Sequence, residues 1–120
     1  MSQPSAPIYL SIARAMEFIG DANGVLSLLK TLHQTLSDDL PLLQESLDKD
    51  DVYGANRILH QLKGFVPVFC VDSLVDRVVE VEALSKHAPI EDLAKAMTPL
   101  LEQLSVLKSE VERQLNNPLG

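Results

Sequence analysis

The chain has 120 residues, enough for one domain whose apolar core needs neither a disulfide nor a metal. Hydrophobic residues make up 46% of it and aromatic residues only 4%, and this Leu-rich mixture favours helices over strands. The formal net charge is −7, and the ten Lys and Arg residues are scattered singly, which argues against nucleic acid or an anionic membrane as the partner.

The single cysteine and the first residues of the chain favour a reducing compartment inside the cell over secretion. Cys70, the single cysteine, cannot form an internal disulfide, and it lies within an apolar run, so we expect a packed thiol in a reducing environment. The first residues, MSQPSAP, have no basic segment followed by an apolar one, as a secretory signal would. The apolar run 65–71 is too short to cross a bilayer. We therefore expect a cytoplasmic protein.

The N-terminal half of the chain predicts a tail and two helices. Prolines in residues 1–7 indicate a flexible tail, and residues 117–120 indicate another. A short helix is expected over about 9–19, ended by Gly20, with Asp21 starting the next. That second helix should run over about 22–47. Pro41 should bend it, because proline cannot donate to the carbonyl of Ser37.

The C-terminal half predicts three further helical segments. Asp50 or Asp51 is placed to cap a third helix that continues to about residue 69, and a fourth is expected over about 72–86. A fifth should reach about residue 115, with a kink or a split at Pro99, where Thr98 is available as a cap. These lengths and short connections predict an all-α fold over residues 8–116, an antiparallel up-down-up-down four-helix bundle with a short additional N-terminal helix.

His60 lies on the wrong side of the third helix for a core residue. At about 100° per residue, the apolar side chains of that helix gather between roughly 140° and 260° from His60. An exposed histidine is usually just a solvated polar residue, but its neighbours here are unusual. Lys63 and Gly64 follow it by one turn on the same side, and Arg57 precedes it by one turn.

Each of these neighbours would help if the imidazole accepted a phosphoryl group. A neutral imidazole has a free nitrogen lone pair that can attack phosphorus. Lys63 would neutralise charge on the transferring group, and Arg57 would add to this at longer range. Gly64 costs about 1 kcal/mol of helix stability relative to Ala. The absence of a side chain at this position would let a partner protein approach His60 closely, which explains a glycine here. Other side chains around this spot are expected to contact the partner: Tyr53, Gln61, Pro67 and Val68.

The string Ala55-Asn56-Arg57-Ile58-Leu59-His60-Gln61-Leu62-Lys63-Gly64 resembles the signature of the histidine-containing phosphotransfer (HPt) domain family. In that signature a phosphorylatable histidine is followed by leucine at +2, lysine at +3 and glycine at +4. The resemblance extends upstream to the helix opened by Gly20-Asp21 and downstream to Leu74, Val78 and the pair Val81-Glu82. It implies a four-helix bundle whose His60 takes phosphate from a receiver-domain aspartate and hands it on.

The chain departs from the family pattern after Gly64. HPt domains commonly carry small residues there and a second glycine near +10, whereas residues 65–70 are bulky and Cys70 stands at the glycine position. We expect a repacked core between the third and fourth helices and a third helix that bends or ends early at Pro67. The departure bears on the shape of the docking surface and on the choice of partner.

The resemblance implies a phosphoryl carrier without catalysis of its own. The partners would be receiver domains of a hybrid sensor kinase and of a response regulator. This chain is expected to need no cofactor of its own, and magnesium would be bound by the receiver domain. We expect a monomer, because the face around His60 must stay open. An alternative from another class is a helical adaptor that binds a signalling protein through the same face without accepting phosphate.

Other candidate sites are weaker. His33 is expected at the edge of the core with a hydrogen-bond partner, and His87 on the surface. Cys70 is expected to be a buried packing residue. The acidic residues of the last two helices are expected to lie on solvent-exposed helix faces. The sequence contains no Glu-x-x-His, H-E-x-x-H or cysteine pair for a metal, no Gly-x-Ser-x-Gly, and no Gly-rich phosphate loop.

Overall fold

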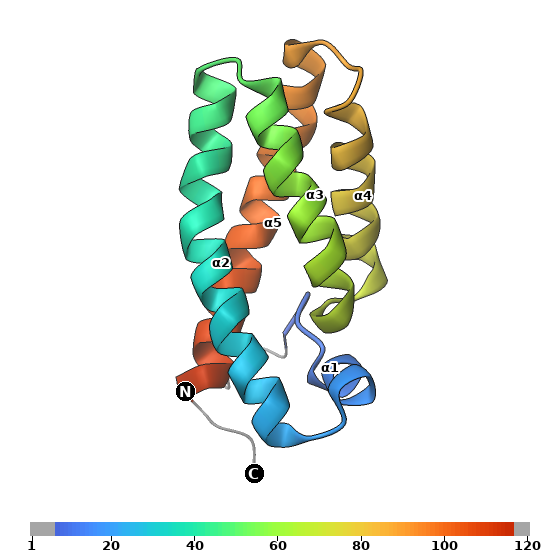
Figure 1. Cartoon of the computed structure of the whole chain (residues 1–120), viewed down its shortest axis with the longest axis vertical. Coiled ribbons are helices and arrows are strands. Elements are labelled where there is room, and N and C mark those ends of the chain that lie inside the picture. Colours follow the sequence, from blue (N-terminus) through green and yellow to red (C-terminus); the bar gives the residue numbers. More distant parts are fainter. Residues whose placement is uncertain (1–6, 117–120) are drawn as a thin grey trace, which may run out of the picture.

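The computed structural model describes residues 7–116, which form five helices (Figure 1). They are α1 (Ile12–Ile19), α2 (Ala22–Asp48), α3 (Val52–Phe69), α4 (Asp72–Leu84) and α5 (Ile90–Asn116). The long helices alternate in direction along the bundle, and each packs on two of the others in the cyclic order α2, α3, α4, α5. The predicted all-α, up-down-up-down bundle with a leading helix is confirmed. Apart from Pro7, the predicted tails lie outside the described residues.

Helix α1 begins three residues later than the sequence predicted, at Ile12. Ser11 caps it, since its hydroxyl accepts a hydrogen bond from the backbone N–H of Arg14. Gly20 ends it in the left-handed conformation at φ 94°, and Asp21 caps α2 through the N–H of Gly24, both as predicted. Helix α1 therefore sits across the lower end of α3, against α2 and α3 (Figure 1).

The segment before α1 is extended and packs across the end of the bundle. Leu10 forms an isolated antiparallel bridge with Cys70. The N–H of Ser11 donates to the carbonyl of Phe69, and the N–H of Val71 donates to the carbonyl of Tyr9. These backbone groups are satisfied by strand-like pairing, which is why the predicted helix does not extend back to Tyr9.

Prolines do not break the helices in which they lie. Helices α2, α3 and α5 run continuously through Pro41, Pro67 and Pro99. Of the alternatives expected from the sequence, an early end of α3 at Pro67 and a split of α5 at Pro99 are excluded, and a bend or kink at these prolines stays a prediction. Pro67 lies in the last turn of α3 and removes only the one hydrogen bond that its N–H would have donated to the carbonyl of Lys63, and the helix continues to Phe69. Thr98 does not cap a new helix, because its hydroxyl donates to the carbonyl of Ala94 within the same one.

The acidic connection 49–51 positions α3. Lys49 ends α2, Asp50 takes a positive φ of 54°, and Asp51 caps α3 through the N–H of Gly54. Of the two acidic candidates, Asp51 is the cap. This turn fixes the start of α3 and therefore the direction in which each of its side chains points.

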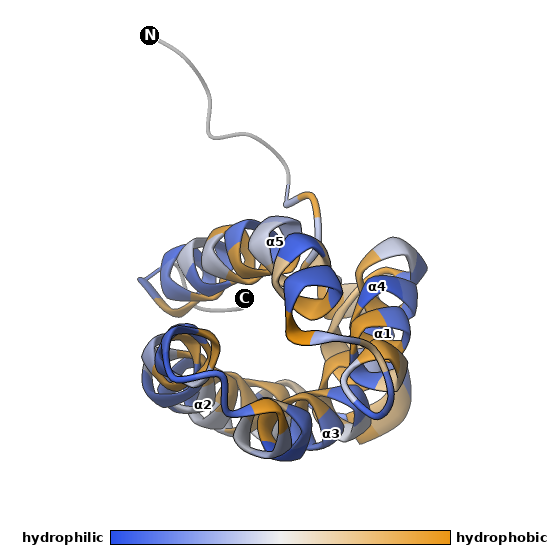
Figure 2. Ribbon diagram, turned by 90° about the horizontal axis from the view of Figure 1, so that it is seen from above, coloured by the Kyte–Doolittle hydropathy of each residue, from blue (hydrophilic) through white to orange (hydrophobic). Residues whose placement is uncertain are grey.

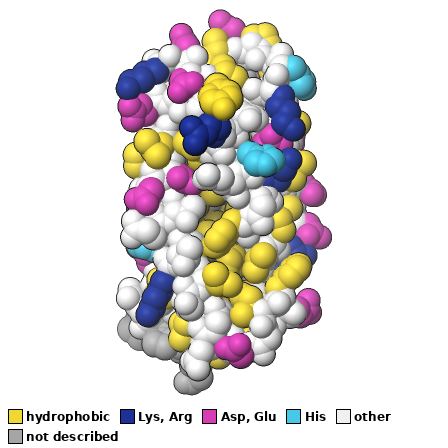
Figure 3. Space-filling view, in the orientation of Figure 1, with side chains coloured by type: hydrophobic (Ala, Val, Ile, Leu, Met, Phe, Trp, Pro, Cys, Tyr) yellow, Lys and Arg dark blue, Asp and Glu magenta, His cyan; other side chains and the backbone are white. Residues whose placement is uncertain are grey.

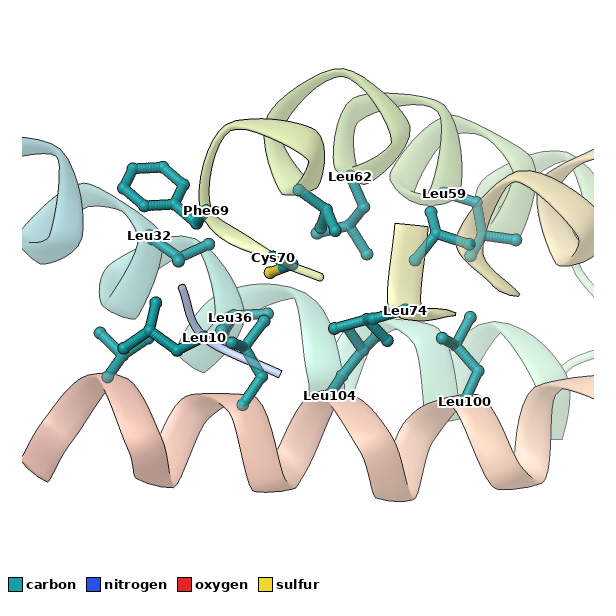
Figure 4. Close-up of a cluster of buried hydrophobic side chains, with 14 of the residues drawn as sticks. Leu10, Leu32, Leu36, Leu59, Leu62, Phe69, Cys70, Leu74, Leu100 and Leu104 are labelled. Atoms are coloured by element: carbon teal, nitrogen blue, oxygen red, sulfur yellow. The ribbon is translucent and has the colours of Figure 1, made fainter. Parts of the chain in front are cut away.

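Leucine-rich faces of all four long helices meet in one core. Hydrophobic residues turn toward the bundle axis (Figure 2), and side chains from α2, α3, α4 and α5 interdigitate around Leu10 and Cys70 (Figure 4). Phe69 is fully buried, and its ring stacks on Phe65 with centroids 5.4 Å apart. Of the bulky residues after Gly64, Val66, Phe69 and Cys70 are thus buried in this core. No helix within residues 7–116 is long and apolar enough to cross a membrane.

Candidate functional site around His60

His60 lies on the exposed face of α3, as the helical projection predicted. The buried residues of this helix are Ala55, Leu59, Leu62, Val66 and Phe69, and they face the core. Since these positions repeat every three or four residues, the opposite face of the helix is left to His60. The imidazole is therefore open to a partner while the rest of its helix is held firmly by the bundle.

The surface beside His60 is clear. Gly64, one turn later, is exposed, and a Cβ atom added there would meet nothing within 4 Å. The fold therefore does not require a glycine at this position. Tyr53 is 75% exposed and Gln61 is exposed, whereas Pro67 and Val68 are half-buried. All the predicted contact residues are thus at least partly accessible.

The face that carries α3 divides into two areas (Figure 3). Basic and acidic side chains gather over its upper half, and hydrophobic side chains gather over its lower half, toward α1. Residues 64–69 of α3 run down into this lower half. A partner that reaches His60 along this face would meet polar groups on one side and apolar groups on the other.

Lys63 is held by a buried carboxylate on the neighbouring helix. Its Nζ lies 2.8 Å from Oε1 of Glu82 on α4, and only 2% of the Glu82 side chain is exposed. The other carboxyl oxygen, Oε2, accepts a hydrogen bond of 3.0 Å from Asn56 and lies 3.3 Å from Nζ of Lys86. Ser85 completes the cluster, since its hydroxyl donates to the carbonyl of Glu82 and accepts from Asn56.

This cluster keeps Glu82 ionised despite its burial. The hydrogen bond from Lys63 lowers the pKa of Glu82, outweighing the opposite effect of desolvation, and the bonds from Asn56 and Lys86 act in the same direction. A buried carboxylate with two cations is a fixed negative charge beside the exposed face of α3. It holds the Lys63 ammonium on the α4 side of His60.

Arg57 does not join Lys63. It is exposed and lines a groove between α2 and α3, whereas Lys63 turns toward α4. The two cations predicted around His60 therefore stand on opposite sides of it. Of these two cations, Lys63 is the one whose side chain is oriented by a buried carboxylate, that of Glu82.

The acidic residues of α4 and α5 are not all solvated, so that expectation was wrong for Glu82 and Glu110. Both are buried. The spacing of Leu74, Val78 and Val81 gives the signal that was missed, because Glu82 follows Val78 by four residues and so shares its inward face. Such a position for a carboxylate predicts a buried partner, here supplied by α3.

The remaining histidines and the cysteine have structural surroundings. His33 is half-buried, with Nε2 2.9 Å from Oε1 of Glu112, which agrees with an edge-of-core residue that has a partner. His87 is exposed. Cys70 is fully buried, and this burial raises the pKa of its thiol to about 12, which leaves it unreactive. Within the described residues, no group of three or more His, Cys, Asp or Glu side chains is placed to hold a metal ion.

Comparison with known families identifies this arrangement. Residues 27–116 match the Hpt domain family, a span that includes His60, most of α2 and all of α3, α4 and α5. The chain belongs to the Hpt domain family. Hpt domains are phosphocarrier modules of two-component signalling, and they interact with the receiver domains of phosphorelay proteins. No significant match was found among curated proteins or among solved structures.

Proposed function

We propose that His60 accepts a phosphoryl group from a receiver-domain aspartate of a hybrid sensor kinase and passes it to the receiver domain of a response regulator. The observation that carries this proposal is the exposed imidazole of His60 on a helix whose opposite face is fully packed, in a chain of the Hpt domain family. A nucleophile in this position is fixed in place yet reachable by another protein.

The proposed transfer is a substitution at phosphorus. The lone pair of Nε2 on the neutral His60 ring forms a bond to phosphorus as the bond from phosphorus to the aspartyl oxygen breaks, and the electron pair leaves with the receiver carboxylate. The proton on Nδ1 stays on the ring or exchanges with water. Attack by a second aspartate reverses these steps, so the carrier needs no cofactor of its own. Magnesium, bound by the acidic pocket of the receiver, supplies the metal chemistry.

Lys63 has the role of balancing charge on the transferred group. Its ammonium lies one helical turn from His60, and the phosphoryl group brings additional negative charge to that spot. To bind the phosphoryl oxygens, Lys63 must share or leave the Glu82 carboxylate. Glu82 then keeps two donors, Asn56 and Lys86, so its charge is not left unpaired in the protein interior.

The surface around His60 suits a receiver domain that docks closely. Gly64 leaves room for a partner backbone, and the half-buried side chains of Pro67 and Val68 offer apolar contact beyond it. Tyr53 and Gln61 extend the contact on the other side of His60. On this proposal the protein works in the cytoplasm as a monomer, with its single histidine face open to one receiver at a time.

The test is transfer of radiolabelled phosphate from a phosphorylated receiver domain and its magnesium. Three versions of the protein are compared: the wild type, His60→Gln, and the control His87→Gln, which removes an exposed histidine elsewhere. Acid-labile, base-stable label should appear on the wild type and on the control, and it should be absent from His60→Gln. If receivers bind the wild type but label neither it nor the control, the adaptor function replaces the proposal.

A further inference from the structure

A groove runs between α2 and α3 beside the histidine face. Its volume is about 380 Å³, and Arg57 and Gln61, which flank His60 on α3, both line it. The α2 wall includes Asp39 and Leu42, and the turn between the helices closes its upper end. The groove therefore opens onto the surface next to the proposed phosphoryl acceptor.

Three of the five charged side chains that line the groove, Glu45, Lys49 and Asp51, have partners within the described residues, whereas Asp39 and Arg57 have no ion pair or side-chain hydrogen bond there. Nζ of Lys49 lies 2.5 Å from the Glu45 carboxylate, and Asp51 accepts the N–H of Gly54 as the cap of α3. Asp39 is 9% exposed, and its Oδ2 atom is buried with no hydrogen-bond donor within the described part of the chain. A buried carboxyl oxygen without a donor is rare in folded proteins. Because Asp39 also lines the groove, its carboxylate is the acceptor there that a ligand can reach.

We propose that this groove binds a lysine or arginine side chain of the docking receiver domain, with the Asp39 carboxylate as its acceptor. The inference rests on the proposed function, because the receiver must cover this area when it reaches His60. A protein interface of ordinary size buries about 800 Å² on each partner, which extends well beyond one helical turn from its centre. Arg57 and Gln61, which line the groove and lie within one turn of His60 on α3, fall inside such an interface.

The Asp39 carboxylate should make the protein discriminate between receivers. Asp39 is still 9% exposed, and a receiver that seals the groove without supplying a donor removes the remaining water from a carboxylate that already has one unpaired oxygen, which is unfavourable. A receiver that carries a cation at this point gains a charge-assisted hydrogen bond in a site shielded from water. The same carboxylate therefore favours one class of partner and rejects the other.

The chemistry of the groove fits a long cationic side chain. Three carboxylates line it (Asp39, Glu45 and Asp51) against two cations (Lys49 and Arg57). Leu42, 46% exposed, and Ile58 offer apolar walls for an aliphatic stem. Burial, with the neighbouring charge of Asp38, raises the pKa of Asp39, and a bound cation would oppose this effect.

The first experiment uses n-propylguanidinium as a probe of the groove, followed by NMR shifts of the backbone amides. In the wild type, shifts should concentrate at groove residues. Asp39→Asn, which keeps the size of the side chain, should weaken binding at least about tenfold, because it removes the charge of the acceptor. Asp38→Asn is the matched control, since Asp38 is exposed and bonded to Gln34 on the same helix, and it should bind as the wild type does.

The wild type itself provides a second measurement that does not depend on a variant. Binding of the probe should weaken as the pH falls and Asp39 takes up a proton. Shifts that are equal in the wild type and Asp39→Asn, or binding that is insensitive to acid, would overturn the assignment of Asp39. So would the absence of shifts at groove residues.

Failure of this inference and failure of the proposed function give different results. Labelling of the wild type by phosphoramidate, a small phosphoryl donor that needs no docking, tests the reactivity of His60 alone. If His60 is labelled but the groove does not bind the probe, the Asp39 inference fails and the phosphoryl-acceptor role stands. If the groove binds the probe but neither phosphoramidate nor receivers label His60, the proposed function fails, and with it the receiver as the source of the cation.

Discussion

The ammonium of Lys63 on α3 lies 2.8 Å from the Glu82 carboxylate on α4, and that carboxylate is almost entirely buried. This ion pair joins the helix that carries His60 to its neighbour. It fixes the position of a cation beside the histidine before any phosphate arrives. A lysine held in this way loses less conformational freedom on meeting a phosphoryl group than a freely moving one would.

Replacing Glu82 with Gln should reduce stability in a pH-dependent way. The pKa of Glu82 is lowered from its usual value of 4.5, so its charge stabilises the fold above that pH, and this contribution is lost as the pH falls through the lowered folded-state pKa. Thermal unfolding should show the variant less stable than the wild type at pH 7, with the gap narrowing below about pH 4.5. Glu80→Gln, at an exposed position on the same helix, is the control. A gap that stays constant from pH 7 to pH 3 would show that the charge of Glu82 is not responsible.

Replacing Lys86 with Met should affect the phosphorylated protein more than the free one. In the free protein Glu82 keeps Lys63, and Lys86 is more than half exposed, so its loss has a small effect. On the proposed function, Lys63 is shared between Glu82 and the phosphoryl group after phosphorylation, so Glu82 then depends more on Lys86. The equilibrium share of phosphorylated chain, measured against one receiver, should fall about twofold to fivefold, which corresponds to about 0.5–1 kcal/mol.

Two variants control the Lys86 experiment. Lys86→Arg should restore the share of phosphorylated chain, because arginine keeps the charge. Lys95→Met, at an exposed position on α5, should leave it unchanged. An equal drop in Lys86→Met and Lys95→Met would mean that only the net charge of the protein matters.

Replacing Gly64 with Ala should slow phosphoryl transfer from a receiver domain without destabilising the fold. An added Cβ meets nothing within 4 Å, so the helix should gain stability, by up to about 1 kcal/mol, from the better helix former. Transfer from a receiver should slow by about tenfold or more, because the methyl group holds the partner away from His60. Labelling by phosphoramidate should not change. Wild-type transfer rates in Gly64→Ala would remove the reason proposed for this glycine.

The sequence was sufficient to predict the elements whose signals are local. Asp21 and Gly20 mark helix ends by their own conformational preferences, and the spacing of apolar residues in α3 places His60 opposite the core. The signature around His60 then identified the family. These features depend on residues within a few positions of one another.

The features that could not be predicted depend on contacts between distant segments. The extended start of the chain replaces a predicted helical turn because Leu10 pairs with Cys70, sixty residues away in sequence. The pairing of Lys63 with Glu82 instead of with solvent, and the separation of Arg57 from it, follow from how α3 rotates against α4 and α2. Helical periodicity fixes the face on which a residue lies, but it does not say which neighbour that face meets.

Glu110 on α5 gives a final prediction, about the N-terminal segment. Its buried carboxylate accepts the backbone N–H groups of Ile8, Tyr9 and Leu10, the last two at 3.0 Å. This one side chain therefore holds the extended segment that covers Cys70. Glu110→Ala leaves three backbone donors without their acceptor, and we expect a loss of about 2–4 kcal/mol in the free energy of unfolding.

The loss should be local in its structural effect. In Glu110→Ala, amide hydrogen exchange should rise at Leu10, Ser11 and Val71, and the thiol of Cys70 should become reactive to alkylating reagents. His60 lies toward the middle of α3, away from this end, so its labelling by phosphoramidate should stay close to that of the wild type. Glu102→Ala, exposed on the same helix, is the matched control. If the thiol of Cys70 is equally protected from alkylation in both variants, the segment is held by its pairing with residues 69–71 and not by Glu110.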